Sequence, residues 1–422
     1  MAKIEHFEMR LGADASRVVI RPFHIAPEPR KSSRVKRIVD EVMSFDEATC
    51  ERELQEVNGD FSERHWQTAE VYLQRFNYVG RELGLRGADL SQSRRELIGA
   101  YFCHEYSYAA AAIMNPSIVP HPDQSGLWPG DQRFVMSMRT VGEGHISSIS
   151  FREGILSKEG KLTLWPQSAP TIAAYAEEPC AEGPVLARRP SSVNISGTVI
   201  FPFTQAQRNG LEDLRLVQFE EDDAHKVYYG TYTAYSGTSI GSELMTTKDF
   251  STFLLEPMRG PAANNKGMAL FPKRVDGGYA MIGRQDGESL YFLQSDDLRR
   301  WDGGTLVMAP KYPWELVQIG NCGCPIELDE GWLLLTHGVG AMRKYSIGAA
   351  LLDKKNPAKV LGRMALPLLE PSLQNRDGYV PNVLYTCGGL KHGQKLFMPY
   401  GVADSSVGFA LIDIPSLLED MR

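Results

Sequence analysis

The 422-residue sequence lacks a long apolar run. No stretch approaches the roughly 18 consecutive apolar residues that a membrane-spanning helix needs. The first residues, MAKIEHFEMRLG, also lack the apolar core of a secretion signal. The sequence therefore predicts a cytoplasmic protein that has no membrane partner.

Basic residues are fewer than acidic ones, and cysteines are few. The 45 Lys and Arg residues are outnumbered by 52 Asp and Glu, for a net charge of −7. A nucleic-acid partner is not expected, because phosphate backbones are bound by clustered basic residues. Among six cysteines, Cys322 and Cys324 are the only close pair, and no His/Cys cluster with zinc spacing accompanies them. We therefore expect reduced thiols, no metal site and no cofactor.

Helical patterns dominate the first 112 residues after a short β-like segment at 16–23. Ser44–Glu47 reads as a capping box, with Ser44 at the N-cap and a glutamate three residues later. A second helical stretch is predicted from Ser62 to about Leu85, and a third from Ser91 to the alanine-rich segment that ends at Ile113. We expect residues 1–112 to form a mainly helical extension that packs on the protein or supports a homo-oligomer.

After residue 113 the pattern changes to short strands that are separated by Gly and Asp turns, and it recurs five times. Each unit has an apolar middle strand, at 134–139, 227–232, 279–284, 332–337 and 396–400. Each middle strand is preceded by a strand that opens with Asn or Asp, at Asn115, Asp213, Asn265, Asn321 and Asn382. A third strand follows each middle strand after a short polar loop. Such radial repetition predicts an all-β five-bladed β-propeller over 113–422, with 160–192 as an excursion between blades.

The repeat also predicts where polar side chains meet. Strand openings and the ends of adjacent antiparallel strands lie at the same end of a blade. Six residues should therefore converge on one mouth of the central channel: Asp213, Lys266, Arg284, His337, Tyr400 and Asp404. Cations around at least one acid suit an anion or a sugar. Each residue also has an ordinary structural explanation as a turn cap, a surface charge or a buried histidine, and the same holds for Glu143.

Five sequence motifs follow one another along the chain: Gly210–Arg215, Tyr232–Ser236, Asn265–Pro272 with Gly278–Arg284, Gly331–Gly338, and Tyr400–Asp404. Together they resemble the motifs of glycoside hydrolase family 130, which comprises mannoside phosphorylases and some β-mannosidases. The resemblance extends in order from Asn115 to Ile412. It implies a five-bladed β-propeller, in agreement with the repeat, and an inverting reaction on a β-mannoside.

The resemblance also implies residue roles. Asp213 is expected to be the general acid, relaying its proton through the 3-hydroxyl of the mannose. In a phosphorylase, inorganic phosphate is the co-substrate and yields α-mannose 1-phosphate, and its expected ligands are Lys266, Arg284, His337 and Gln318. Gln318 departs from the family pattern, which has lysine there, so a charge-assisted hydrogen bond to phosphate is lost.

A hydrolase would instead need a carboxylate base, for which Glu315 or Glu327 is the candidate. We expect further contacts to a small mannose-containing oligosaccharide from Asn115, Arg139, Glu143, Arg215, Tyr235, Asp286, Asn321, Tyr400 and Asp404. The residues favour phosphorolysis, because cations without an anion to bind would be costly. An inverting β-mannosidase and a non-catalytic sugar-binding propeller stay open as alternatives.

Overall fold

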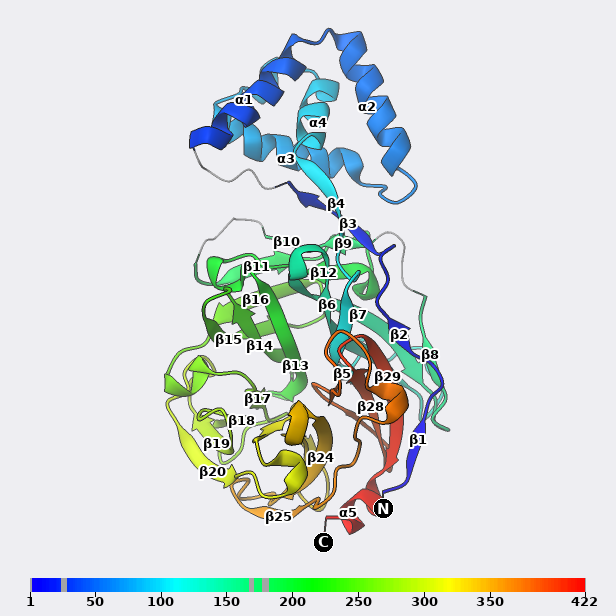
Figure 1. Cartoon of the computed structure of the whole chain (residues 1–422), viewed down its shortest axis with the longest axis vertical. Helices are drawn as coiled ribbons and strands as arrows, with labels where there is room; N and C mark the ends of the chain where they lie inside the picture. The colour runs from blue at the N-terminus through cyan, green and yellow to red at the C-terminus, as the bar shows by residue number, and fades with distance from the viewer. Residues whose placement is uncertain (1, 24–28, 167–170, 177–181, 422) are drawn as a thin grey trace. The chain divides into compact units, whose positions relative to one another are not determined.

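The computed structural model describes residues 2–23, 29–166, 171–176 and 182–421, and it is mostly β with few helices (Figure 1). It divides into two compact units. The larger comprises residues 1–15, 109–168 and 174–422, and the smaller comprises 16–108 and 169–173. Among the described residues, no helix is both long and apolar enough to cross a membrane.

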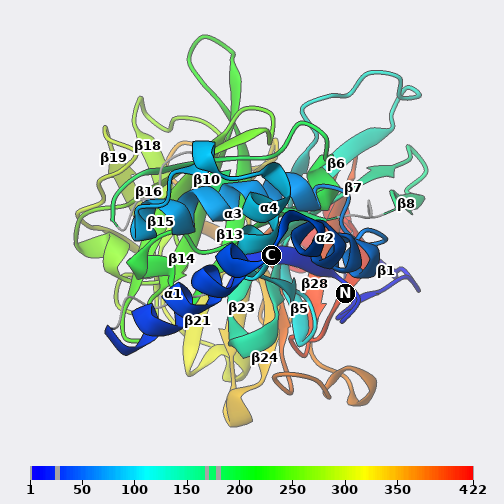
Figure 2. The ribbon, with the colours of Figure 1, turned by 90° about the horizontal axis from the view of Figure 1, so that it is seen from above.

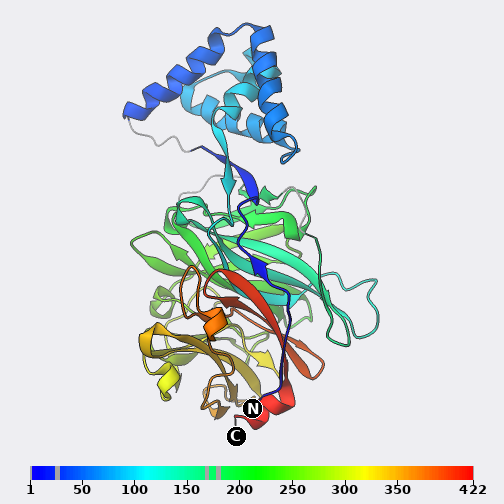
Figure 3. The same ribbon diagram turned by 45° about the vertical axis from the view of Figure 1, so that its right-hand side comes forward.

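The N-terminal residues differ from the predicted division at 112/113, because they belong to the larger unit. Strand β1 (Ile4–His6) and strand β2 (Leu11–Gly12) both pair with β29 (Ser406–Asp413), and Figure 3 shows β1 running beside the last strands. The helical segment is therefore inserted after the first strands of the larger unit.

In its described residues, the smaller unit holds four α-helices and a two-stranded sheet. The helices are α1 (Pro29–Ser44), α2 (Glu47–Phe61), α3 (Thr68–Leu83) and α4 (Gln92–Ala100), and Figure 2 shows them from a second side. The short helix η1 (Gly87–Asp89) precedes α4, and β3 (Val18–Pro22) pairs with β4 (Cys103–Ser107). Apolar side chains three or four residues apart, such as Val35, Val39 and Val42 on α1, form the buried core with Phe76 and Leu97.

The helix boundaries correct part of the sequence interpretation. Ser44 ends α1 instead of capping a helix, because Asp46 is the N-cap of α2 and accepts a 2.7 Å hydrogen bond from the Thr49 amide. The predicted start of a helix at Ser91 is confirmed, because Ser91 is the N-cap of α4 and its side chain accepts a hydrogen bond from the Arg94 amide. The predicted helical extension to Ile113 is wrong, because the chain enters β4 after Phe102.

Antiparallel strand groups build the larger unit, and the five predicted middle strands all form. The first group contains β5 (Ala112–Pro120), β6 (Gln132–Val141), β7 (Ser147–Leu156) and β8 (Leu162–Leu164). The second contains β13 (Gly210–Glu220), β14 (Lys226–Tyr235), β15 (Ile240–Thr247) and β16 (Thr252–Pro257). The third contains β17 (Ala269–Leu270), β18 (Tyr279–Gly283), β19 (Leu290–Ser295) and β20 (Gly304–Met308).

Two further groups complete the series. The fourth contains β21 (Gln318–Asn321), β22 (Ile326–Glu327), β23 (Trp332–Val339), β24 (Tyr345–Leu352) and β25 (Val360–Arg363). The fifth contains β26 (Leu384–Tyr385), β27 (Leu390–His392), β28 (Lys395–Val402) and β29, to which β1 adds. Helix α5 (Ile414–Glu419) follows β29.

Short elements decorate these groups. The predicted excursion at 160–192, of which 167–170 and 177–181 lie outside the described residues, supplies outer strands: β8 pairs with β7, and β11 pairs with β16. The remaining short strands are β9 (Ile172–Ala173), β10 (Tyr175–Ala176), β11 (Val185–Arg188) and β12 (Thr198–Ile200). The remaining 3-10 helices are η2 (Glu143–His145), η3 (Ile195–Gly197), η4 (Gln205–Gln207), η5 (Pro261–Asn264), η6 (Pro313–Glu315), η7 (Ala341–Arg343) and η8 (Leu373–Asn375).

Hydrophobic clusters join each strand group to the next. Separate clusters connect the first group with the second, the second with the third, the third with the fourth and the fourth with the fifth. A further cluster connects the fifth group back to the first, where Phe134 and Phe397 pack with ring centroids 5.7 Å apart. Burial of apolar side chains between neighbouring sheets is the main stabilising contribution.

Candidate active site

A polar cavity of about 200 Å³ lies among the opening residues and hairpins of the strand groups. Nine of the predicted site residues line it: Asn115, Arg139, Asp213, Arg215, Lys266, Arg284, Gln318, His337 and Asp404. Four lining residues were not predicted: Arg343, Tyr345, Val383 and Tyr385. The structure therefore brings together most of the polar side chains that the strand pattern had singled out.

Local breaks in two strands aim side chains into this pocket. Asn115 on β5 and Asp213 on β13 have φ angles of 50° and 56°, in the left-handed region that Asn and Asp tolerate better than most residues. The pairing register shifts at both places, between Met114 and Ser117 and between Glu212 and Arg215. Such a β-bulge redirects a side chain that regular alternation would point elsewhere.

Asp213 lies in a network of donors. One carboxylate oxygen, Oδ1, accepts from the Asn115 side-chain amide at 2.7 Å and from Arg139 Nη1 at 3.3 Å. Burial alone would raise the pKa of Asp213, but Arg139, Arg215, the Asn115 bond and Lys266 outweigh it and lower the pKa to about 2. The carboxylate is therefore ionised at neutral pH.

Asp404 is the second carboxyl group of the pocket, and its environment acts in the opposite direction. It follows Ala403 in the β28–β29 hairpin, where the φ angle is 48° at Ala403 and 51° at Asp404. Burial and the neighbouring charge of Asp213 raise the pKa of Asp404 to about 6, against the attraction of Arg139 and Arg343. Two carboxyl groups with pKa values pushed apart are a frequent feature of acid–base sites.

His337, Arg284 and Gln318 form one wall of the pocket. His337 Nε2 lies 3.4 Å from Arg284 Nη1 and 3.4 Å from the Gln318 side-chain nitrogen, both of which are donors. Burial, Arg284 and Arg215 together lower the pKa of His337 well below its ordinary value. The imidazole is therefore neutral, and Nε2 accepts. Among the described residues, Arg284 forms no ion pair.

Arg215 is held at the base of the pocket. It is 3% exposed, and it donates from Nη1 to the Asp213 carbonyl oxygen at 2.9 Å and from Nη2 to the Tyr385 hydroxyl at 2.7 Å. Burial raises the pKa of the Tyr385 phenol well above its ordinary value, so the hydroxyl stays protonated. The rings of Tyr385 and His337 lie with centroids 4.8 Å apart. Arg215 and Tyr385 thus fix the base of the site.

Lys266 is already paired with a carboxylate. Its Nζ lies 2.7 Å from Glu212 Oε2, and the other oxygen of Glu212 accepts from Arg139 Nη2 at 2.8 Å. Glu212 therefore bridges two of the pocket cations. Burial would lower the pKa of Arg139, but Asp213, Glu212 and Asp404 raise it.

The two candidate bases of a hydrolase do not line the pocket. Glu315 is fully buried in η6, where it pairs with Arg363 and accepts from the amides of Lys311 and Tyr312. Glu327 pairs with Lys273 at 2.8 Å and with Lys354 at 3.1 Å. Each carboxylate therefore pairs, through Oε1, with cations that do not line the pocket.

Five residues that were predicted to contact the sugar also do not line the pocket. Glu143 is exposed in the β6–β7 hairpin, the Tyr235 hydroxyl donates to the Gly237 carbonyl, and Asp286 accepts from the amides of its own turn. Tyr400 is buried and its hydroxyl bonds His6, because strand alternation turns it toward β1. Asn321 is 1% exposed and ends β21 instead of opening a strand.

Of the pocket residues that the sequence analysis missed, Arg343 could have been found from the repeated hairpin position. Arg343 is the second of two left-handed residues in the β23–β24 hairpin, as Asp404 is in the β28–β29 hairpin. Asp404 was singled out at that turn position and Arg343 was not. Tyr385 belongs to the predicted strand after Asn382, but its hydroxyl bond to Arg215 spans 170 residues and has no local signature.

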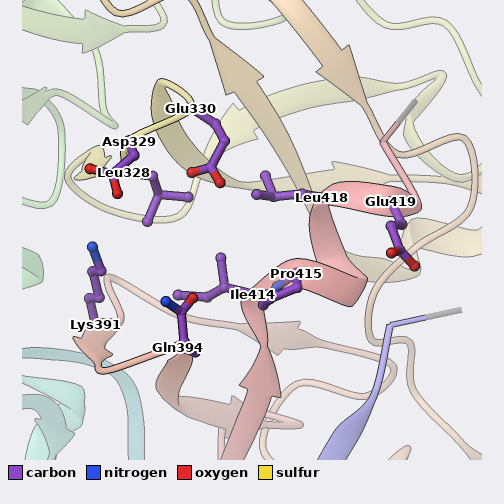
Figure 4. A pocket seen from close by; sticks show the side chains of 9 residues that line it. All are labelled: Leu328, Asp329, Glu330, Lys391, Gln394, Ile414, Pro415, Leu418 and Glu419. Atoms are coloured by element: carbon purple, nitrogen blue, oxygen red, sulfur yellow. The ribbon is translucent and has the colours of Figure 1, made fainter.

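A second hollow of about 200 Å³ lies beside α5 and lacks a converging set of groups. Figure 4 shows Glu419 at the opposite end from Asp329 and Lys391, with the apolar Leu328 and Leu418 between them. Throughout the described part of the chain, no cluster of three or more His, Cys, Asp or Glu residues could hold a metal ion. The polar pocket is the better candidate for chemistry.

The family follows from sequence comparison. Residues 193–422 match the model of a protein family described as beta-1,4-mannooligosaccharide phosphorylase. The chain belongs to glycoside hydrolase family 130. That match begins before Asp213 and covers eleven of the thirteen pocket residues, leaving out Asn115 and Arg139.

Curated relatives from this family are phosphorylases. A 1,2-beta-oligomannan phosphorylase of Thermoanaerobacter sp. (strain X514) is 30% identical over 225 residues, which are 51% of this chain and 72% of the relative. A beta-1,2-mannobiose phosphorylase of Listeria innocua is 31% identical over 230 residues, which are 53% of this chain and 63% of the relative.

Solved structures of family 130 share the fold. The Listeria innocua beta-1,2-mannobiose phosphorylase, in complex with beta-1,2-mannobiose, has a TM-score of 0.52 at 22% identity, covering 75% of this chain and 93% of that one. A second structure is described under family 130 glycoside hydrolases that target beta-1,2-mannosidic linkages in Candida mannan. It has a TM-score of 0.53 at 18% identity, and the match covers 73% of this chain and 86% of that one. At these identities the likeness concerns the fold alone.

Proposed function

We propose that the protein cleaves β-mannosides by inverting phosphorolysis and releases α-mannose 1-phosphate. The observation that carries this proposal is that Arg284 has no carboxylate partner among the described residues. Arg284 lies in the pocket wall that it forms with His337 and Gln318. A half-buried guanidinium without a counter-charge is costly, and a phosphate oxyanion is the partner that its planar donors suit. The phosphorylase relatives support the same reaction.

Asp213 is the general acid of this proposal. An oxygen of phosphate attacks the anomeric carbon, the glycosidic C–O bond breaks, and its electron pair stays on the leaving sugar oxygen, which takes a proton. Asp213 is ionised in the free pocket because of Arg139 and Arg215. A bound phosphate partly neutralises these arginines, so it raises the proton affinity of Asp213 and prepares it to donate.

Asp213 and Asp404 are the two carboxyl groups that line the described pocket, and we assign them different roles. Asp404, with its pKa near 6, holds a proton more readily than Asp213 and is suited to hydrogen-bond a sugar hydroxyl. Asn115 and Arg139 hold Asp213 in place through bonds of 2.7 and 3.3 Å. We assign Lys266 to the sugar side of the pocket, since Glu212 already neutralises it.

The architecture that we infer is a five-bladed β-propeller. Its support is the series of five groups of antiparallel strands, the first two of which are joined by a short parallel pairing of β7 with β13. Hydrophobic clusters link each group to the next and the last to the first. A cavity of about 290 Å³ is lined by residues from all five groups, among them Val119, Leu216, Ile326 and Leu390 on strands and Pro272 just after β17. We interpret it as the other end of the central channel.

The hydrolytic alternative has one observation in its favour, the neutral Gln318 on the phosphate wall. However, its two candidate bases, Glu315 and Glu327, are bound to cations elsewhere.

The helical unit keeps its predicted role in packing or oligomerisation. Light scattering on the full chain measures the mass, and a monomer at all concentrations contradicts the homo-oligomer.

A phosphate-dependence assay separates the reactions. The full chain is incubated with β-1,2- or β-1,4-mannobiose, with and without inorganic phosphate. Phosphorolysis predicts that cleavage needs phosphate and that each free mannose is accompanied by one mannose 1-phosphate. Cleavage at the same rate without phosphate, giving mannose alone, supports the hydrolase. Binding of mannobiose without cleavage in either condition supports the sugar-binding protein. Asp213→Asn is the matched control, and it should remove turnover but retain sugar binding.

A further inference from the structure

Arg343 stands at the mouth of the pocket on the tip of a tight hairpin. It lies between β23 and β24, where Met342 and Arg343 have φ angles of 57° and 56°. The β28–β29 hairpin has the same pair of left-handed residues at Ala403 and Asp404. Both second residues, Arg343 and Asp404, line the pocket. The turn conformation, repeated in neighbouring strand groups, therefore aims each of these side chains at the same space.

The guanidinium of Arg343 has no ion pair within the described residues. The adjacent Lys344 differs, because its Nζ lies 2.6 Å from Glu370. The Arg343 side chain is exposed, and its guanidinium carbon lies 5.9 Å from the centroid of the Tyr345 ring. That ring is stacked on His337, with centroids 5.9 Å apart and planes 12° from parallel. Arg343 thus adjoins the aromatic side of the wall that carries Arg284 and Gln318.

The wall itself supplies little positive charge. Arg284 is cationic, whereas His337 is neutral and Gln318 is an amide. Arg215, at the base, already donates to a carbonyl oxygen and to the Tyr385 hydroxyl. Phosphate near neutral pH carries between one and two negative charges. A second guanidinium at the entrance would balance that charge and offer paired donors with a geometry that matches phosphate.

We propose that Arg343 is a phosphate-binding residue, which captures the dianion at the pocket mouth and supplies the positive charge that Gln318 does not. This inference rests on the proposed phosphorolysis. Tyr345 serves as the platform that orients the guanidinium, through a cation–π contact on the ring that also packs against His337. An exposed arginine remains hydrated until the anion arrives, so it also attracts phosphate toward the buried Arg284.

The test is steady-state kinetics of Arg343→Met on the full chain. We expect the KM for phosphate to rise about tenfold, as for the loss of one charge-assisted hydrogen bond, while the KM for mannobiose and kcat change by less than about twofold. Lys344→Met removes the adjacent, ion-paired cation and should leave all three constants unchanged. Gln318→Lys in the Arg343→Met background returns a cation to the same wall and should recover most of the phosphate affinity.

Each alternative result contradicts the inference. An unchanged KM for phosphate in Arg343→Met, or a rise confined to the KM for mannobiose, removes Arg343 from the phosphate site. Failure of Gln318→Lys to restore phosphate affinity rejects the charge argument. Calorimetric titration of inorganic phosphate into the sugar-free protein gives an independent reading, in which we expect about tenfold weaker binding by Arg343→Met. Phosphate-independent cleavage by the unmodified protein would instead reject the proposed function itself.

Discussion

Replacing Asp404 by asparagine should stabilise the fold at neutral and alkaline pH, although the residue lines the active pocket. Burial and the charge of Asp213 raise the pKa of Asp404 from 3.8 to about 6. A carboxyl group with a raised folded-state pKa favours the folded protein below its unfolded pKa and loses that contribution as the pH rises through 6. Asparagine keeps a neutral side chain of the same shape at every pH.

The magnitude follows from the pKa interval. At about 1.36 kcal/mol per pKa unit, the interval between 3.8 and about 6 corresponds to at most about 3 kcal/mol. Water at the pocket mouth and the cations Arg139 and Arg343 screen part of this repulsion. We therefore expect Asp404→Asn to raise the free energy of unfolding by about 1–2 kcal/mol near pH 8, and by little near pH 4.

Urea unfolding followed by tryptophan fluorescence measures this difference in phosphate-free buffer. Five of the six tryptophans lie in the unit that contains the pocket, and only Trp66 lies in the helical unit. Asp286→Asn is the control of opposite sign. The bonds from the Ser289 and Glu288 amides and from Tyr291 outweigh burial and lower the pKa of Asp286, so its replacement should bring no gain at either pH.

A stability gain of equal size at both pH values would refute the reasoning, because it would owe nothing to ionisation. Lower stability of Asp404→Asn near pH 8 would refute it as well, since the carboxylate would then be favourably placed. Retention of a destabilising carboxylate at a pocket residue is the usual trade between stability and activity.

Three further predictions concern the site and its supports. Asp213→Asn should lower kcat by about 10²–10⁴ while the KM for mannobiose stays within a few-fold, in steady-state assays, and an unchanged kcat would exclude it as the general acid. Glu315→Gln should lower the free energy of unfolding by about 3 kcal/mol, measured by urea unfolding, because the partly buried Arg363 is left without its carboxylate partner, and an unaffected stability would contradict that ion pair. Tyr385→Phe should raise the KM for mannobiose several-fold in steady-state assays, because Arg215, an expected sugar contact, loses the hydroxyl that holds it, and an unchanged KM would show that this bond does not position the arginine.

The strand order was predictable because burial imposes a local pattern. The middle strands, such as 332–337 and 396–400, consist mainly of apolar side chains between polar turns, and they fall inside β23 and β28. The helix starts were harder. Ser44 and Asp46 both suit an N-cap, and only the geometry of the Asp46–Thr49 bond shows which residue takes that position.

Site residues were predictable where a strand position repeats, and not where long-range packing decides. Asn115 and Asp213 hold corresponding positions in the first and second strand groups, where each lies at a break in strand pairing. Tyr400 ends a repeated strand, and Glu315 was a candidate base near Gln318, but His6 binds Tyr400 and Arg363 binds Glu315 away from the pocket. Such partners lie dozens to hundreds of residues away, so no local pattern announces them.

The central claim, that the pocket transfers mannose to phosphate with inversion, is tested most directly by phosphorus NMR of the reaction. The full chain, a β-mannobiose and inorganic phosphate are observed together, and the anomeric configuration of the product is stable because its C1 oxygen carries the phosphate. The account predicts a single new signal, that of α-mannose 1-phosphate, growing as inorganic phosphate declines. A β-configured product, or loss of the disaccharide while inorganic phosphate remains constant, would contradict it.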